Sequence, residues 1–199
     1  MSEGDALAEF VAVMRRLRVE CAWKQEQTHR SLARYLLEET HETLEAIDRG
    51  DHDHLREELG DLLLQVVFHA VIAEEAGVFD LDQVARGITE KMIRRNPHVF
   101  GEEGAGGLTP DEIDAQWQRI KATEKGRESP EEGIPPTLPA LLYADKLLGR
   151  LADAGRPATI DPASADLGER LLALVAEARE AGVDPEQALR EAVRSRLSG

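Results

Sequence analysis

The sequence predicts an all-α protein. Alanine, leucine, glutamate and arginine, which favour helices, recur along the chain, and no stretch alternates apolar and polar residues for long. Signals for helix starts and stops are also clear. Thr109, Pro110 and Glu112, for example, supply a capping residue, a first-turn proline and a capping-box acid.

Five helices are predicted in the first 125 residues, over about 5–20, 31–49, 53–75, 80 or 82 to 96, and 110–125. The first is followed by a loop with Cys21, Trp23 and Thr28, and the second stops at Gly50. Residues 101–107 form a glycine-rich loop. Residues 126–138, rich in Pro, Glu and Gly, are a predicted linker, and two or three helices follow, with starts near residues 139, 161 and 184. This predicts a domain over 1–125, a linker over 126–138 and a helical tail over 139–199.

Composition restricts the partners of the protein. The 199 residues carry 39 acidic side chains against 24 Lys and Arg, which gives a formal charge of −15. Such a chain would repel a nucleic-acid polymer, but it can still bind a small phosphate ligand through a local cation or a metal ion.

The single cysteine fits a reducing compartment. Residues 1–20 show no secretory signal, and the apolar run over 62–73 is too short to span a bilayer. A cytoplasmic protein with no membrane partner is expected.

Two acidic motifs on consecutive predicted helices form the candidate site. They are Glu38-Glu39-x-x-Glu42 and Glu58-x-x-Asp61. The motifs are symmetric about Gly50, so an antiparallel hairpin would place both at one height. Four carboxylates at one level repel each other unless a cation lies between them, and hard oxygen ligands suit Mg²⁺ or Mn²⁺.

A helical projection favours Glu39 and Glu42 over Glu38 as ligands. Glu39 flanks the apolar stripe of its helix, whereas Glu38 falls near the opposite side. The alternative is that these acids are ordinary solvated helix faces. Glu38-x-x-His41 raises a di-iron site as a rival, but the motif occurs once, so magnesium is favoured. His52 and His54 are expected in the hairpin turn, away from the carboxylates.

Two pairs of cations are candidates for binding phosphate. Lys91 and Arg95 are four residues apart, as are Lys121 and Lys125, so each pair can share a helix face. The alternative is that they are C-terminal cations that complement the helix dipole. The sequence contains no P-loop and no Gly-x-Gly-x-x-Gly fingerprint.

The leucine-rich pattern Leu-Gly-acid-x-Leu-Leu occurs at residues 59–64 and again at 167–172. These residue types are common in this chain. The match is therefore open between an internal repeat and two ordinary amphipathic helices.

Over about residues 5–125 the chain resembles the MazG nucleoside triphosphate pyrophosphohydrolases. The shared segments are Gln27-Thr28-His29-x-Ser31-Leu32, Tyr35-Leu36-Leu37-Glu38-Glu39-x-x-Glu42, the run over 57–70, Lys91-x-Ile93-Arg94-Arg95-x-Pro97-His98-Val99-Phe100 and Trp117-x-x-Ile120-Lys121. The resemblance implies an α-helical bundle that forms a homodimer or a higher homo-oligomer. It also implies Mg²⁺-dependent hydrolysis of nucleoside triphosphates between the α and β phosphates, which yields a monophosphate and pyrophosphate and cleans up the nucleotide pool.

The resemblance also implies roles for individual residues. The family's metal signature falls on Glu38, Glu39, Glu42, Glu58 and Asp61. The resulting hypothesis has Glu39, Glu42, Glu58 and Asp61 hold Mg²⁺, with Mn²⁺ as a possible substitute. Glu38 and Glu39 are the candidate catalytic residues, and Lys91, Arg95, Lys121 and Lys125 the candidate phosphate ligands.

The chain departs from the family at three places. Cys21-Ala22-Trp23-Lys24 replaces the usual Cys-Pro-Trp-Asp, and Asn96-Pro97-His98 replaces His-Pro-His. The tail resembles a second family domain that has lost its Glu-Glu-x-x-Glu helix, so it is expected to be a degenerate and inert repeat. Two other functions stay open: a pyrimidine-specific hydrolase of the dUTP type, and a nucleotide-binding scaffold without catalysis.

Overall fold

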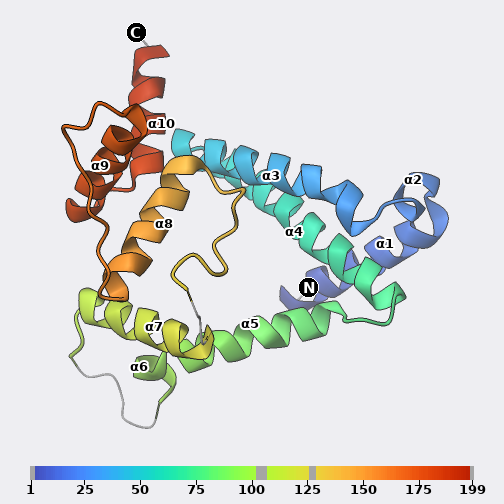
Figure 1. Ribbon diagram of the computed structural model, residues 1–199. Coiled ribbons are helices and arrows are strands. Elements are labelled where there is room, and N and C mark those ends of the chain that lie inside the picture. Colours follow the sequence, from blue (N-terminus) through green and yellow to red (C-terminus); the bar gives the residue numbers. More distant parts are fainter. Residues whose placement is uncertain (1–2, 102–106, 126–128, 198–199) are drawn as a thin grey trace. The chain divides into compact units, whose positions relative to one another are not determined.

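The computed structural model in Figure 1 describes residues 3–101, 107–125 and 129–197, apart from the side chains of residues 3–5, 122 and 125. Every regular element in these ranges is helical, which confirms the predicted all-α class. The helices are α1 Glu3–Glu20, α2 Ala22–Gln25, α3 His29–Arg49, α4 His52–Glu75, α5 Leu81–Arg95, α6 Pro97–Phe100, α7 Pro110–Lys125, α8 Ala140–Asp153, α9 Leu167–Glu180 and α10 Pro185–Leu197.

The chain divides into two compact units, residues 1–113 and 114–199. The division falls inside α7, whereas the sequence places a domain boundary after residue 125. The assignment of 1–125 as the catalytic domain concerns function and stays a prediction.

Two short helices and one late start differ from the sequence-based expectation. α2 interrupts the expected loop over 21–28, and α6 follows Pro97 directly. The start predicted near residue 161 is wrong, because α9 begins at Leu167. Asp161 instead accepts a hydrogen bond from the backbone N–H of Ala163 in a turn, and Asp166 caps α9 by accepting one from Glu169.

The pair formed by α3 and α4 is the centre of the N-terminal unit, where the two helices lie side by side (Figure 1). Gly50 ends α3 with a φ of 66°, a left-handed conformation that glycine adopts without steric cost. The side chain of Asp51 then caps α4 by accepting hydrogen bonds from the backbone N–H groups of Asp53 and His54. The predicted helical hairpin is confirmed.

The hydrophobic core lies between α1, α3 and the second half of α4. Its buried members are Val11, Met14, Leu32, Val67, Phe68 and Val71. Most of α4 beyond Gln65 is therefore committed to packing. The first half of the helix, toward Gly50, is left free to carry polar side chains.

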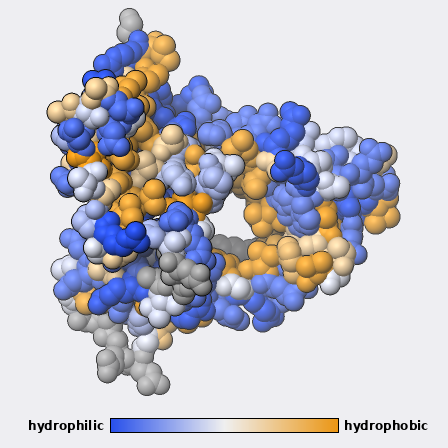
Figure 2. All heavy atoms as spheres, viewed as in Figure 1, coloured by the Kyte–Doolittle hydropathy of each residue, from blue (hydrophilic) through white to orange (hydrophobic). Residues whose placement is uncertain are grey.

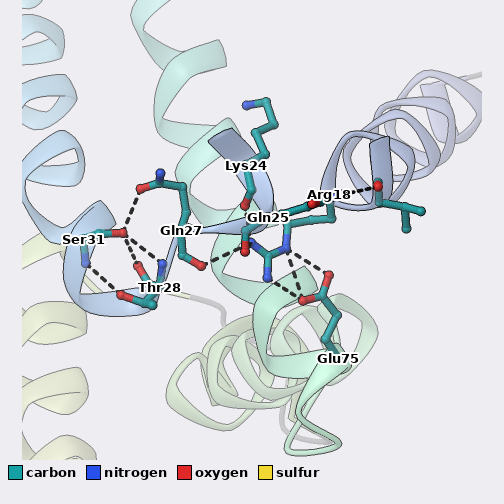
Figure 3. Close-up of polar contacts among 8 residues, drawn as sticks. Arg18, Lys24, Gln25, Gln27, Thr28, Ser31 and Glu75 are labelled. Carbon is teal, nitrogen blue, oxygen red and sulfur yellow. Dashed lines mark hydrogen bonds and ion pairs between the residues drawn. The ribbon is translucent and has the colours of Figure 1, made fainter. Parts of the chain in front are cut away.

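Arg18, at the end of α1, fastens the α2 segment to the end of α4 (Figure 3). Its side chain is only 10% exposed, and it forms an ion pair with Glu75 at 2.6 Å. It also donates to the backbone carbonyls of Lys24, Gln25 and Gln27. These contacts place the loop that leads into the capping box of Thr28 and Ser31 at the start of α3.

In the C-terminal unit, α8, α9 and α10 pack against one another. Val175 and Leu148 are buried there, and Arg179 on α9 forms an ion pair with Asp145 on α8 at 3.0 Å. Among the helices that the structure describes, none is both long enough and apolar enough to cross a membrane.

Candidate metal centre

The α3–α4 hairpin brings three carboxylates together. Glu39 on α3 and Glu58 and Asp61 on α4 each have a potential ligand atom, and these atoms lie within 4.8 Å of one another. Glu39 and Asp61 stand the same number of residues from Gly50, which is why they meet across the hairpin. Three of the four predicted ligands therefore form a cluster. Helix spacing alone was sufficient to indicate it.

The electrostatics of this carboxylate cluster (Glu39, Glu58 and Asp61) fit a cation. Burial raises the pKa of Glu39, and the negative charge of Asp61, a hydrogen bond with Glu42 and the charges of Glu42 and Glu58 raise it further. Burial and the neighbouring carboxylates both disfavour the charged form of Glu39 at this place. Carboxylate oxygens are the ligands that Mg²⁺ and Mn²⁺ prefer, so the donor set suits the metal that the sequence predicts.

Glu58 is the most buried member of the cluster, at 7% exposure. Buried carboxylates require partners, and the Nε2 atom of His54 lies 2.8 Å from Oε1 of Glu58. The expectation that His54 lies away from the carboxylates is therefore wrong. The physical cause is helix spacing: His54 falls within the first turn of α4, and four residues along a helix bring its ring to Glu58.

Glu42 and Glu38 are both exposed and lie outside the cluster of three. Glu42 is linked to it through its hydrogen bond with Glu39, so it stands at the solvent side of the site. Glu38 is on another side of α3, as the helical projection indicates. Their roles as ligand and as catalytic residue stay predictions.

The candidate phosphate ligands lie on two different units. Lys91 and Arg95 are on α5 of the N-terminal unit, with Lys91 partly exposed and Arg95 7% exposed. Lys121 is on the C-terminal unit, where its ammonium lies 4.9 Å from the centroid of the Trp117 ring. The side chain of Lys125 is outside the described residues. A phosphate-binding role for the four stays a prediction.

Beyond Asp61, α4 carries two further polar side chains toward the core. Gln65 is buried with no partner for its Oε1 among the described residues, and the same holds for Nε2 of His69. Nδ1 of His69 lies 2.7 Å from Nδ1 of His29, and the two rings are stacked. Gln65 and His69 lie inside the apolar run over 62–73 and have no role in the sequence-based hypothesis, although two polar residues in a buried helix are a signal in themselves.

Lys24 occupies the place where the family has an acid. Its ammonium lies 5.0 Å from the centroid of the Phe68 ring and 5.5 Å from that of Trp23. The substituted base therefore covers the edge of the core through cation–π contacts. It makes no contact with the carboxylate cluster in the interactions described.

Comparisons with known proteins identify the family of the chain. The family model of the MazG nucleotide pyrophosphohydrolase domain matches residues 27–100, which include the whole cluster. A nucleoside triphosphate pyrophosphohydrolase/pyrophosphatase MazG of Thermotoga maritima is 39% identical, over 96% of this chain and 82% of that protein. A nucleoside triphosphate pyrophosphohydrolase of Escherichia coli is 42% identical, over 90% of this chain and 70% of that protein.

Other relatives differ in length. A relative from Mycolicibacterium smegmatis, also named a nucleoside triphosphate pyrophosphohydrolase, is 44% identical over 96% of this chain, which spans only 56% of that protein. Among solved structures, a mazG-related protein from Thermotoga maritima covers 57% of this chain at 26% identity with a TM-score of 0.49. From the identity and coverage of the sequence relatives, the chain belongs to the MazG nucleotide pyrophosphohydrolase family.

Proposed function

We propose that this protein is a Mg²⁺-dependent nucleoside triphosphate pyrophosphohydrolase that converts NTP or dNTP into a monophosphate and pyrophosphate. One observation carries the proposal: three carboxylates from two helices meet within 4.8 Å, in a chain whose relatives are named for this activity. A proton or a cation between its members relieves the repulsion in such a cluster. Removal of surplus nucleotides from the cellular pool follows as the role, with a cytoplasmic location.

Glu39, Glu58 and Asp61 would hold the metal, with Glu42 as a further oxygen donor at the solvent side. A divalent cation bound there neutralises phosphate charge and makes water a better nucleophile at neutral pH. Because −15 is the formal charge of the chain, a cation also removes the repulsion that a nucleoside triphosphate would otherwise meet.

The remaining residues would position the substrate and accept a proton. A water oxygen bonds to phosphorus, the bond to the bridging oxygen between the α and β phosphates breaks, and pyrophosphate leaves. Glu38 keeps the role that the family resemblance implies, to orient that water or accept its proton, although it is exposed on another side of α3 from the cluster. Lys91 and Arg95 would hold phosphate oxygens from α5.

The tail is proposed to be a degenerate repeat without catalysis. Its pattern over 167–172 matches the one over 59–64. The acid directly before the pattern, however, already has a structural role as a helix cap. Asp166 accepts a hydrogen bond from the backbone N–H of Glu169 and caps α9. No partner helix with a Glu-Glu-x-x-Glu motif occurs in this part of the sequence.

We also propose that the protein is a homodimer that buries an exposed face of α4. Leu59, Leu63 and Val66 lie at helical spacing on this face and are 41–51% exposed. Figure 2 shows apolar residues at the surface of this unit, beside hydrophilic ones. Rows of large apolar side chains on one helix are typical of interfaces between subunits.

Pyrophosphate release from a panel of ordinary and altered nucleoside triphosphates, with Mg²⁺ present, tests the proposed activity. Glu39→Gln and Asp61→Asn should each abolish turnover while the circular dichroism spectrum stays helical. Glu57→Gln is the matched control, because Glu57 is exposed, carries the same charge and is adjacent to Glu58. Absence of turnover on every substrate would exclude an enzyme and leave the nucleotide-binding scaffold. Turnover of dUTP alone would establish the pyrimidine-specific alternative.

A further inference from the structure

His54 is a polar contact of the carboxylate cluster for which neither the proposed reaction nor the family signature has a role. Its Nε2 atom lies 2.8 Å from Oε1 of Glu58, and the two side chains are 32% and 10% exposed. With a proton on Nε2, this close nitrogen–oxygen contact attracts the carboxylate. The contact is therefore between a half-buried donor and a nearly buried acceptor, and solvent competes with it little.

The backbone holds His54 in place for this contact. The Asp51 carboxylate caps α4 and accepts hydrogen bonds from the backbone N–H groups of Asp53 and His54, each at 3.1 Å. Since that cap sets the first turn of α4, the ring of His54 is four residues from Glu58 on a rigid helix. The position of the donor does not depend on a flexible loop.

The contact with His54 makes the two oxygens of Glu58 inequivalent. Oε1 lies against Nε2 of His54, and Oε2 has no such neighbour among the residues that the structure describes. A carboxylate with one oxygen already bonded is a poor two-oxygen ligand but a good one-oxygen ligand. Mg²⁺ requires compact octahedral coordination, whereas Ca²⁺ takes more ligands and often both oxygens of a carboxylate.

We propose that His54 is a positioning residue that makes Glu58 a one-oxygen ligand, so that the cluster selects Mg²⁺ over Ca²⁺. The inference rests on the proposed function only in taking Glu39, Glu58 and Asp61 as a cation site. Partners of this kind, which hold a ligand rather than the metal, orient carboxylates and imidazoles in many metal sites.

Cation binding without nucleotide tests the proposal. Binding of Mn²⁺ to the full chain is measured from the electron paramagnetic resonance signal of the free ion, and Mg²⁺ or Ca²⁺ is then titrated in as a competitor. The variants are His54→Ala, which removes the donor, and His54→Gln, whose amide nitrogen can take the place of Nε2. His52→Ala is the matched control, because His52 is an exposed histidine in the same helical turn.

His54→Ala should weaken Mg²⁺ binding about tenfold, the usual cost of losing such a partner. Ca²⁺ binding should weaken less, so the preference for Mg²⁺ falls. His54→Gln should keep most of the preference, and His52→Ala all of it. The thermal midpoint of each variant with EDTA separates these effects from a loss of folding.

Three results would overturn the inference. One is Mg²⁺ affinity in His54→Ala within about twofold of the unchanged chain, and another is an equal loss for Mg²⁺ and Ca²⁺. The third is a loss of preference in a folded His54→Gln as large as that in His54→Ala. If the unchanged chain binds no Mn²⁺ at all, the cation site itself is refuted. That outcome counts against the proposed function and is distinct from the other three.

Discussion

Glu39 offers a direct test of charge repulsion in the carboxylate cluster. Burial and the neighbouring charges raise its pKa, so the native state binds a proton at Glu39 more readily than the unfolded chain does. The stability linked to this proton is complete below the ordinary pKa of 4.5 and is lost as the pH rises through the raised native value. At neutral pH and without metal, Glu39 is therefore a destabilising charge. Glu39→Gln should make the metal-free protein more stable.

The magnitude follows from the cluster's geometry. Glu39 lies within 4.8 Å of potential ligand atoms on both Glu58 and Asp61, which gives at least ~0.9 kcal/mol of repulsion per pair in water and ~3.5 kcal/mol at an effective dielectric of 20. Because the side chains can move apart and the site is partly solvated, we expect a net gain of about 2 kcal/mol. For a chain of this length that corresponds to a rise in Tm of roughly 4–8 °C.

Thermal unfolding in EDTA and in Mg²⁺, at neutral pH, measures this effect. Mg²⁺ at a hundred times its Kd should stabilise the unchanged chain by about 2.7 kcal/mol, and it should stabilise Glu39→Gln much less because one ligand is lost. Glu38→Gln is the control for stability, since it removes the same charge one residue away on an exposed side of α3. The reasoning fails if Glu39→Gln lowers the metal-free Tm, or shifts it no more than Glu38→Gln.

Three further predictions concern the scaffold. Arg18→Met should destabilise the protein by about 2 kcal/mol because it removes an ion pair and the donor to two partly buried carbonyls, whereas Arg15→Met, at an exposed ion pair, should cost under about 1 kcal/mol in urea unfolding. Burial and the nearby His29 lower the pKa of His69, so its neutral ring adds stability above the ordinary pKa of 6.5 that is lost as the pH falls through the native value. The difference in Tm between the unchanged chain and His69→Gln should therefore change between pH 7 and 5, and a constant difference would contradict this. Leu63→Asp should convert a dimer to a 22.0 kDa monomer in light scattering, and a chain that is already monomeric would refute the dimer.

Local rules were sufficient for most helix boundaries and for the core of the site. Gly50 ends α3, and the capping box at Thr109 begins α7. Both signals act within a few residues, so these two boundaries lie where the sequence predicts them. α9 was placed too early because Asp161 and Asp166 are equally good caps in a sequence. Only the turn at Asp161 shows which of them begins the helix.

In the site, too, some features follow from local spacing and others only from tertiary packing. Equal spacing about Gly50 predicted that Glu39 would meet the acids of α4, because the geometry of a hairpin follows from its length. The different surroundings of Glu42 and Glu58 were not predictable in this way. Both belong to matching motifs, yet Glu42 is exposed and Glu58 is buried, since burial depends on what packs around a helix.

By itself, the sequence determined the helical class, the hairpin, the acidic motifs and the family, since each depends on residue type and short spacing. Only the tertiary structure decided which carboxylates converge, that the ring of His54 lies against Glu58, and that Arg18 reaches Glu75 across 57 positions of the chain. Contacts of these kinds depend on where helices pack and how deeply each side chain is buried. That packing is settled by the summed free energy of the whole core, to which no short motif is a guide.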